Sequence, residues 1–457
     1  MIDTHCHLDM YSSITEREEI LSRAFNEGFE YIISVASDLT ASKSALDIAR
    51  THPKVYASVG IHPHDAKDVN DDSLHELKSI IKDSLNSKDN KLVALGEIGL
   101  DYFYNHSPRD VQREGFVKLL SIAKEFDLPV IIHNRDADED TIKLIENSCI
   151  KKALFHCYSS DLNMAKWIIE RGFYISFAGN ITFKKAQLIR EIARYVPDDK
   201  FMIETDAPFL APEPLRGKRN EPSYMIYTAR VIAGLRDVSV DDIDRITSLN
   251  AKKFFQIGVV PEYEIAYKIR DNLYLNITSR CSNSCNFCVK YDTQFVKGHN
   301  LKLDKDPTEE DIIKAIGNPK FYKEIVFCGL GEPTMRLREL KAVARWVKDN
   351  GGKVRLNTNG LGNLINSRNI LPELKKLIDS VSISLNAQNG DTYKRICNPP
   401  YDNAYEEILN FIKESKKYIP SVTITAVDLQ EIDIKKCEDI AKDLDVHFRI
   451  RKLDKVG

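Results

Sequence analysis

The sequence predicts an α/β protein in which a complete (β/α)8 TIM barrel is followed by a partial (β/α)6 barrel. The chain has 457 residues. This length suits three domains of about 150 residues, or two if one of them is a barrel of about 250 residues. Short apolar runs alternate with longer amphipathic stretches along the whole chain. This alternation is typical of parallel strands separated by helices.

The first eight strand candidates lie in residues 1–257. The first strand opens at Ile2, and Val111–Phe126 and Ser223–Leu235 are examples of the helical patterns between strands. The other strand candidates are Tyr31–Val35, Val55–Val59, Leu92–Leu95, Pro129–Ile132, Ala153–Phe155, Phe173–Phe177 and Phe201–Ile203. Eight strands within about 255 residues match the count and size of a (β/α)8 barrel.

Gly258 and Pro261 then interrupt the pattern, so we expect a linker over residues 258–270 and a second domain over residues 271–457. The second domain holds six further strand candidates: Leu273–Thr278, Glu324–Cys328, Lys353–Asn357, Ser380–Leu385, Val422–Ala426 and His447–Ile450. Six β/α units would form a partial barrel.

The composition is that of an ordinary globular protein, with 43% hydrophobic and 29% charged residues. The 65 basic and 68 acidic residues give a net charge of −3, which provides no global attraction to nucleic acid but leaves room for a local patch. No apolar window is long enough to span a membrane, and the first residues show no export signal. We therefore expect a cytoplasmic protein without a membrane partner. Nine cysteines in such a chain point to metal or redox use rather than to disulfides.

Metal-ligating residue types recur at the ends of the first-domain strands. In a strand, residues two apart face the same side, so His5 and His7 can reach one point while Cys6 faces away. The C-terminal rim of a barrel is where active sites lie. The candidates placed there are His5, His7, Glu97, His133, His156 and Asp206. Four imidazoles and two carboxylates suit Zn²⁺, Mn²⁺ or a similar ion, and two metals bridged by a carboxylate can activate water against a phosphodiester.

Residues 1–257 resemble the TatD family of metal-dependent deoxyribonucleases, which have amidohydrolase-like barrels. The resemblance rests on Met1-Ile-Asp-Thr-His-Cys-His-Leu-Asp9, Gly60-Ile-His-Pro-His-Asp65, Gly96-Glu-Ile-Gly-Leu-Asp-Tyr102, Pro129-Val-Ile-Ile-His-Asn-Arg-Asp-Ala137, His156-Cys-Tyr-Ser159, Glu204-Thr-Asp-Ala-Pro-Phe-Leu210 and Arg216-Gly-Lys-Arg-Asn-Glu-Pro222. Ser160 departs from the pattern, because the family usually has Gly there.

The resemblance implies a role for each of these groups. The six rim residues would bind two divalent ions, Mg²⁺, Mn²⁺ or Zn²⁺, with Glu97 bridging them. His62, His64 and Arg135 would contact phosphate or substrate, although the two histidines would also fit an ordinary capped surface loop. Glu204 or Asp206 would assist proton transfer, so the expected catalytic residues are Glu97, Asp206 and Glu204.

Three further cysteines lie close together in the motif Cys281-Ser-Asn-Ser-Cys285-Asn-Phe-Cys288. Soft thiolates select iron–sulfur clusters or zinc. A ferredoxin run supplies four cysteines, whereas here no fourth follows nearby. Three ligands on a [4Fe–4S] cluster leave one iron open to S-adenosylmethionine. The alternative is a structural zinc site completed by His299 or Cys328.

Residues 271–457 resemble the radical SAM superfamily, whose signature is Cys-x3-Cys-x2-Cys. Gly329-Leu-Gly-Glu-Pro333 and Ser382-Ile-Ser-Leu-Asn-Ala387 follow in the expected order. The resemblance implies a partial (β/α)6 radical SAM barrel with a [4Fe–4S] cluster on Cys281, Cys285 and Cys288. It also implies contacts to S-adenosylmethionine from Phe287, Gly331, Glu332, Ser384 and Asn386. Ordinary strand-end hydrogen bonding would equally explain the last two.

The whole chain thus resembles a TatD-type nuclease fused to a TatD-associated radical SAM protein. We expect a bifunctional enzyme that hydrolyses phosphodiesters in DNA or RNA and reductively cleaves S-adenosylmethionine to abstract hydrogen from an unknown substrate. Its expected partners are a nucleic acid and an electron donor such as flavodoxin or ferredoxin. Two alternatives for the first domain remain open: an amide or ester hydrolase, such as a deacylase acting on aminoacyl-tRNA, and a nucleic-acid-binding module without turnover.

Overall fold

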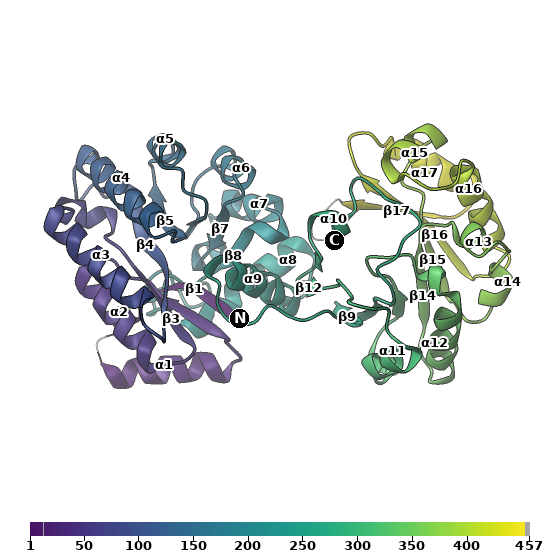
Figure 1. Cartoon of the computed structure of the whole chain (residues 1–457), viewed down its shortest axis with the longest axis horizontal. Coiled ribbons are helices and arrows are strands. Elements are labelled where there is room, and N and C mark those ends of the chain that lie inside the picture. Colours follow the sequence, from purple (N-terminus) through teal and green to yellow (C-terminus); the bar gives the residue numbers. More distant parts are fainter. Residues whose placement is uncertain (12, 453–457) are drawn as a thin grey trace. The chain divides into compact units, whose positions relative to one another are not determined.

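The computed structural model describes residues 1–11 and 13–452, and the chain divides into two compact units, Met1–Val260 and the remainder from Pro261. Figure 1 shows the eight-stranded sheet of the first unit surrounded by helices and the separate sheet of the second unit. Among the described residues, no helix is long and apolar enough to cross a membrane.

The first unit is a parallel barrel whose strands follow one another in chain order, as predicted. Its strands are β1 (Ile2–Cys6), β2 (Tyr31–Ser34), β3 (Val55–Val59), β4 (Leu92–Asp101), β5 (Val130–Arg135), β6 (Ala153–Phe155), β7 (Tyr174–Phe177) and β8 (Phe201–Ile203). The barrel closes where Cys6 and Ala207 form an isolated parallel bridge. The backbone N–H of His7 donates to the Ala207 carbonyl there, at 2.7 Å.

Helices cover the outside of this barrel, and one of them also closes its base. The helices are α1 (Ile14–Asn26), α2 (Leu39–Thr51), α3 (Asp71–Leu85), α4 (Arg109–Glu125), α5 (Asp138–Ser148), α6 (Leu162–Glu170), α7 (Gln187–Tyr195), α8 (Met225–Arg236) and α9 (Val240–Phe255). Strand residues such as Ile33, Ile131 and Met202 form one buried cluster with Phe254 and Phe255 of α9. This apolar layer fills the barrel below the polar rim, so the site rests on a packed floor.

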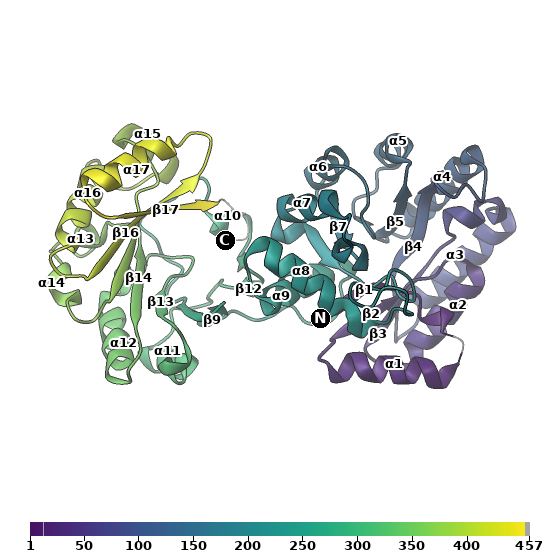
Figure 2. The same cartoon turned by 180° about the vertical axis from the view of Figure 1, so that it is seen from behind.

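The second unit contains the six predicted parallel strands and one more. In sheet order they run β17 (His447–Lys452), β16 (Ser421–Asp428), β15 (Ser380–Ser384), β14 (Val354–Thr358), β13 (Ile325–Phe327), β10 (Asn272–Leu275) and β9 (Ala266–Ile269). Strand β9 is antiparallel to β10 and lies in the segment that we expected to be a linker. Figure 2 shows the same sheet from behind.

Helices pack on one face of the second sheet, where Leu275, Phe327, Leu356, Ile383 and Ile424 belong to one buried core. The helices on this face are α11 (Glu309–Ile316), α12 (Leu337–Asp349), α13 (Gly362–Ile365), α14 (Leu371–Leu374), α15 (Gly390–Cys397), α16 (Ala404–Ser415) and α17 (Ile434–Asp443). The short helix α10 (Val289–Asp292) is not part of this core, and its Val289 packs instead against Tyr267, Leu301 and Leu330. A separate small ribbon joins β11 (Phe295–Val296) and β12 (His299–Asn300). The two described sheet edges are β9 and β17, so the barrel is partial.

Candidate active sites

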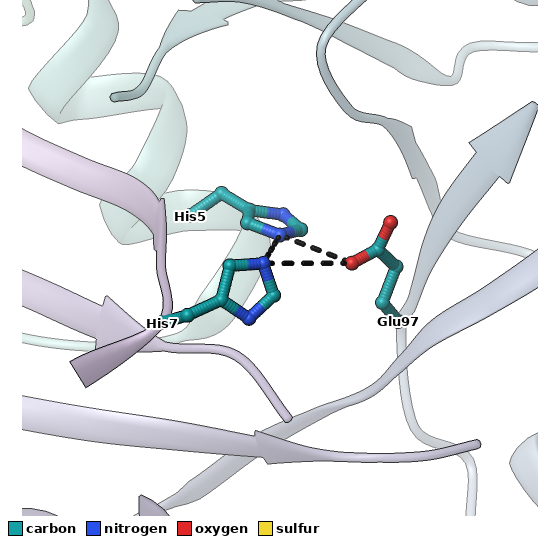
Figure 3. A group of neighbouring side chains, drawn as sticks. All are labelled: His5, His7 and Glu97. Carbon is teal, nitrogen blue, oxygen red and sulfur yellow. Dashed lines mark hydrogen bonds and ion pairs between the residues drawn. The ribbon is translucent and has the colours of Figure 1, made fainter. Parts of the chain in front are cut away.

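The six predicted metal ligands of the first unit converge at the carboxyl ends of the strands. Nε2 of His5 and Nε2 of His7 lie 3.3 Å apart. Figure 3 shows both imidazoles turned toward the Glu97 carboxylate. Ligand atoms of His5, His7 and Glu97 all lie within 4.8 Å of one another, and so do those of His62, Glu97 and His133. The structure thus gathers two groups of donors around one carboxylate.

The two oxygens of Glu97 face different sets of imidazoles. Oε2 lies 3.3 Å from Nε2 of His5 and 3.8 Å from Nε2 of His7. Oε1 lies 2.6 Å from Nε2 of His156 and 2.7 Å from Nδ1 of His133. Nε2 of His62 also lies 3.3 Å from Oε1. A carboxylate shared in this way has the donor arrangement that a bridge between two divalent ions requires.

Asp206 completes the group on the side of His5 and His7. Its Oδ1 lies 3.8 Å from Nε2 of His5 and 3.6 Å from Nε2 of His7. The other ring nitrogen of His7 lies 2.9 Å from the Val35 carbonyl, which fixes the orientation of the ring. Metal-ligating histidines are commonly held through their second nitrogen in this way.

The strands β1 and β4 have local irregularities close to His5 and Glu97. The register of β1 against β2 shifts between Asp3 and Cys6, and that of β4 against β5 shifts between Leu95 and Ile98. An irregularity of this kind changes which residues of a strand face a given side. The strands also extend further than predicted, since β4 continues through Glu97 to Asp101 and β5 continues through His133 to Arg135.

Burial and charge together determine the ionisation of this site. Burial alone would raise the pKa of Glu97, but the charges of His156 and His62 and the hydrogen bond with His133 hold it well below its usual range. Burial disfavours the charged form of His156, yet Glu97 and Glu204 raise its pKa well above the usual value. The site is therefore a network of carboxylates and imidazoles that stabilise one another's charged forms.

Two carboxylates support the ligands from behind. Glu204 is fully buried, and its Oε1 lies 3.4 Å from Nδ1 of His156 while accepting the Cys157 N–H at 2.7 Å. Asp101 is equally buried, and its Oδ2 lies 2.9 Å from Nε2 of His64 and 3.1 Å from Nε2 of His133. Both carboxylates therefore orient imidazoles. Sequence reasoning singled out Glu204 for proton transfer and missed Asp101, although Asp101 lies inside the Gly96–Tyr102 motif.

A cavity of about 750 Å³ opens over the ligands, and His62, His64 and Arg135 lie in its wall with Glu97 and Asp206. The Arg135 guanidinium lies over the rings of Phe103 and Tyr104, 4.0 and 4.7 Å from their centroids. The structure therefore brings all three predicted phosphate contacts to the metal-ligand cluster. Glu204 is not among the residues that line this cavity.

In the second unit, the three predicted cluster cysteines lie in the loop that follows β10, and all three are half-buried. The loop is held by α15, because the Ser284 N–H donates to the Cys397 carbonyl at 3.2 Å and the Asn286 N–H to the Ile396 carbonyl at 2.9 Å. Burial and the nearby Glu332 charge raise the pKa of Cys281 to about 12. A bound metal cluster would displace such thiol protons.

The zinc alternative would need a set of closely spaced ligand atoms. Tetrahedral zinc with Zn–S bonds of about 2.3 Å places its sulfurs about 3.8 Å apart. Within the described part of the second unit, no three metal-ligating side chains bring their ligand atoms within 4.8 Å of one another. His299 is also engaged, since its ring nitrogens lie 2.8 Å from Glu264 and 3.0 Å from the Lys268 carbonyl.

Gly331 and Glu332 lie beside the cysteine loop. A Cβ on Gly331 would come 2.4 Å from the carbonyl oxygens of Thr278 and Arg280, so only glycine fits this close approach of two backbones. The Glu332 N–H donates to the same Arg280 carbonyl at 2.8 Å. Oε1 of Glu332 accepts hydrogen bonds from Thr334 and Thr358, and Oε2 accepts the Asn359 N–H at 2.7 Å.

Ser384 and Asn386 lie at the end of β15, and the structure joins both to a residue that sequence reasoning missed. Nη2 of Arg451 donates to Oγ of Ser384 at 3.3 Å and to Oδ1 of Asn386 at 3.1 Å. Phe287 packs against the core of the second unit. No motif in the sequence distinguishes Arg451, because its partners depend on how β17 aligns with β15.

These features define a metal-dependent hydrolase barrel followed by a radical SAM barrel, and comparisons with known proteins agree. A family model described as TatD related DNase matches residues 2–256, and the Radical SAM superfamily model matches residues 275–444. The chain belongs to the TatD related DNase family and carries a radical SAM domain after it.

Similar proteins cover the first unit almost end to end. The uncharacterized metal-dependent hydrolase YabD of Bacillus subtilis is 39% identical over 260 residues, covering 56% of this chain and 100% of YabD. The uncharacterized metal-dependent hydrolase YcfH of Escherichia coli strain K12 is 34% identical, covering 56% and 96% of the two chains. The crystal structure of the TatD homolog YJJV of Escherichia coli is 28% identical, covers 56% and 98%, and superposes with a TM-score of 0.53.

Membership of these two families indicates that the chain is an enzyme that combines a metal-dependent hydrolase with a radical SAM domain. It also implies divalent metals, an iron–sulfur cluster and S-adenosylmethionine as cofactors.

Proposed function

We propose that the first unit is a metal-dependent phosphodiesterase acting on DNA or RNA, and that the second cleaves S-adenosylmethionine at a [4Fe–4S] cluster. The observation that carries the first half is the division of the two Glu97 oxygens between the His5–His7 side and the His133–His156 side. His5, His7, Glu97 and Asp206 would hold one ion, and Glu97, His133 and His156 would hold the other.

Bound divalent ions would supply Lewis-acid stabilisation of the phosphate charge and lower the pKa of a coordinated water. The side chains contribute positioning and charge around that chemistry. Arg135 presents a planar guanidinium suited to two phosphate oxygens, and His62 and His64 line the same wall. Asp206, which also lines the cavity, would accept a proton from the attacking water at a carboxylate oxygen. Glu204 and Asp101 would hold His156, His133 and His64 in place.

A nuclease assay tests the first half of this proposal. The full chain is incubated with a DNA oligonucleotide or an RNA oligonucleotide and Mg²⁺, Mn²⁺ or Zn²⁺, and His5→Ala is compared with His75→Ala. His75 is exposed on α3, so its loss is the matched control. We expect cleavage that His5→Ala abolishes and His75→Ala retains. Hydrolysis of an aminoacyl ester with no cleavage of either oligonucleotide would instead support the deacylase alternative.

In the second unit, Cys281, Cys285 and Cys288 would hold the cluster. Glu332 lies in the loop after β13, and Ser384 and Asn386 lie at the end of β15, where they would contact the cosubstrate. A bound [4Fe–4S] cluster with one open iron would supply the electron that breaks the sulfonium bond of S-adenosylmethionine. The proposal rests on the loop of three thiols held by α15 next to those strand ends.

Anaerobic reconstitution tests the second half. The full chain is reconstituted with iron and sulfide and assayed with dithionite and S-adenosylmethionine. We expect a brown protein that forms 5′-deoxyadenosine, and a Cys285→Ala variant that forms none. Exposed Cys149 provides the control as Cys149→Ala. A colourless protein that binds zinc and forms no 5′-deoxyadenosine would refute this half. A flavodoxin or ferredoxin is the electron donor that we propose in place of dithionite.

A further inference from the structure

The second sheet has one apolar face and one polar face, and the polar face is positively charged along β17. Ile424 pairs with Phe448 and Ala426 pairs with Ile450 on the helix-covered side. The alternate residues point to the opposite side. There Ser384 pairs with Thr425, and Thr425 pairs with Arg449, so these three side chains lie in one row. Arg451 occupies the next row, opposite Val427.

Among the described residues, no carboxylate forms an ion pair with these arginines. Arg355 on the same face differs from them, because its guanidinium forms an ion pair with the Glu324 carboxylate at 3.2 Å. Within residues 1–11 and 13–452, neither Arg449 nor Arg451 forms an ion pair. The strand residues paired along this face are hydroxyl, amide and apolar residues together with His447 and the arginines.

Arg451 is only partly satisfied by hydrogen bonds. Its Nη2 is fixed by Ser384 and Asn386, while its Nε is buried and has no hydrogen-bond partner among the described residues. An unpartnered buried donor on a guanidinium is costly unless an acceptor from a ligand occupies it. Burial and the neighbouring Arg449 charge lower the pKa of Arg451, and the negative charge of a bound anion would oppose that shift.

Arg451 lies near the element that holds the cysteine loop. Its Nη2 donates to Asn386, which lies just before α15, and the Ile396 and Cys397 carbonyls of α15 accept the N–H groups of Asn286 and Ser284 in that loop. An anion held by Arg451 would therefore lie at the same end of the sheet as the loop that we propose carries the cluster. Arg449 lies two residues further from the carboxyl end of β17, on the same face.

We propose that Arg449 and Arg451 form an oxyanion site that binds a phosphate or carboxylate of the radical substrate. The substrate class is thus anionic, and the hydroxyl of Thr425, which pairs with Arg449, would supply a further hydrogen bond. Two adjacent guanidinium groups suit an oxyanion, because each offers several N–H donors in a fixed plane. This inference rests on the proposed radical SAM function, in which S-adenosylmethionine and substrate meet beside the cysteine loop.

A titration with inorganic phosphate tests the site, and the linewidth of the ³¹P NMR signal is the measurement. The full chain is reconstituted with its cluster and treated with a chelator, which removes divalent ions from the first unit. We expect phosphate binding to broaden the ³¹P signal of the unmodified chain's sample. The apparent affinity should be about tenfold weaker in Arg449→Gln, and no specific broadening should remain in Arg449→Gln/Arg451→Gln. Arg395→Gln, which removes an exposed charge from α15, is the matched control and should bind as the unmodified chain does.

The titration is repeated with saturating S-adenosylmethionine, which distinguishes a site for a substrate oxyanion from a site for the carboxylate of S-adenosylmethionine. Phosphate binding that persists supports a substrate site, whereas displacement would show that the arginines bind the cosubstrate carboxylate and would overturn the proposal. Equal binding by the unmodified chain and the double variant would overturn it as well. The proposed function is checked separately in the unmodified chain without phosphate, where absence of the reduced cluster's EPR signal or of 5′-deoxyadenosine formation would refute that function alone.

Discussion

At the scale of single residues, the proposed function assigns Glu97 as the bridge between two ions. Glu97→Gln keeps the shape of the side chain and replaces one anionic oxygen by an amide, which cannot bridge two cations. We expect phosphodiesterase activity to fall by at least about a hundredfold while the fold is retained. Steady-state kinetics and circular dichroism check this together. Activity within a few-fold of the unmodified chain would contradict the bridging role.

Asp101 provides a second test at this scale. Burial alone would raise its pKa, but hydrogen bonds with His133, the Tyr104 N–H and His64 hold that pKa far below the usual range. Asp101→Asn removes the charge that orients both imidazoles, and residues behind metal ligands typically change metal affinity or activity by about 10–100-fold.

The metal requirement of hydrolysis measures this effect. We expect the Asp101→Asn variant to need a higher concentration of divalent ion for half-maximal activity, whereas Asp110→Asn, at the exposed start of α4, should behave as the unmodified chain. An unchanged metal requirement in Asp101→Asn would show that His133 and His64 do not depend on it.

At the scale of elements, the backbone contact at Gly331 ties the loop after β13 to the loop that carries the cysteines. In Gly331→Ala the new methyl group would lie 2.4 Å from two carbonyl oxygens, so one loop must move. We expect a loss of stability of about 1–3 kcal/mol in the second unit and reduced cluster incorporation.

Chemical denaturation and iron content measure the two effects of Gly331→Ala. Gly390→Ala is the matched control, because its nearest neighbour would be Cβ of Tyr405 at 3.6 Å, an ordinary contact. Equal stability and iron content in the two variants would contradict the requirement for glycine at position 331.

The elements also show what the sequence could and could not predict. The barrel strands, their order and the residues at their ends follow from apolar runs and motifs. The register shifts in β1 and β4 do not, because a bulge depends on the neighbouring strand. Strand β9 was missed because its burial is partial and its residues alternate at a sheet edge, so no apolar run marks it.

Residues that act through distant partners were missed for the same physical reason. Asp101 contacts His64 and His133, which are 37 and 32 residues away in the chain. Arg451 reaches Ser384, 67 residues away. Such contacts arise from strand pairing and cannot be read from local spacing. The convergence of the proposed ligands could be predicted because each lies at or shortly after the end of its own strand.

At the scale of the whole molecule, each unit has its own core, so a ligand of one unit should stabilise that unit. A divalent ion at about a hundred times its Kd adds about 2.7 kcal/mol to the state that binds it. We therefore expect Mn²⁺ or Zn²⁺ to raise the unfolding temperature of the first unit in the full chain. Differential scanning calorimetry measures the shift, which His5→Ala should remove and His75→Ala should keep. A metal-induced shift that survives His5→Ala would contradict the assigned ligands.

The central claim is that one chain carries two chemistries on two separate sets of residues. It is tested most directly by assaying both activities on one reconstituted preparation of the unmodified chain, His5→Ala and Cys285→Ala. The account predicts that His5→Ala loses oligonucleotide hydrolysis and still forms 5′-deoxyadenosine, whereas Cys285→Ala still hydrolyses and forms no 5′-deoxyadenosine. An unmodified chain that forms no 5′-deoxyadenosine, or a Cys285→Ala variant that still forms it, would contradict the account.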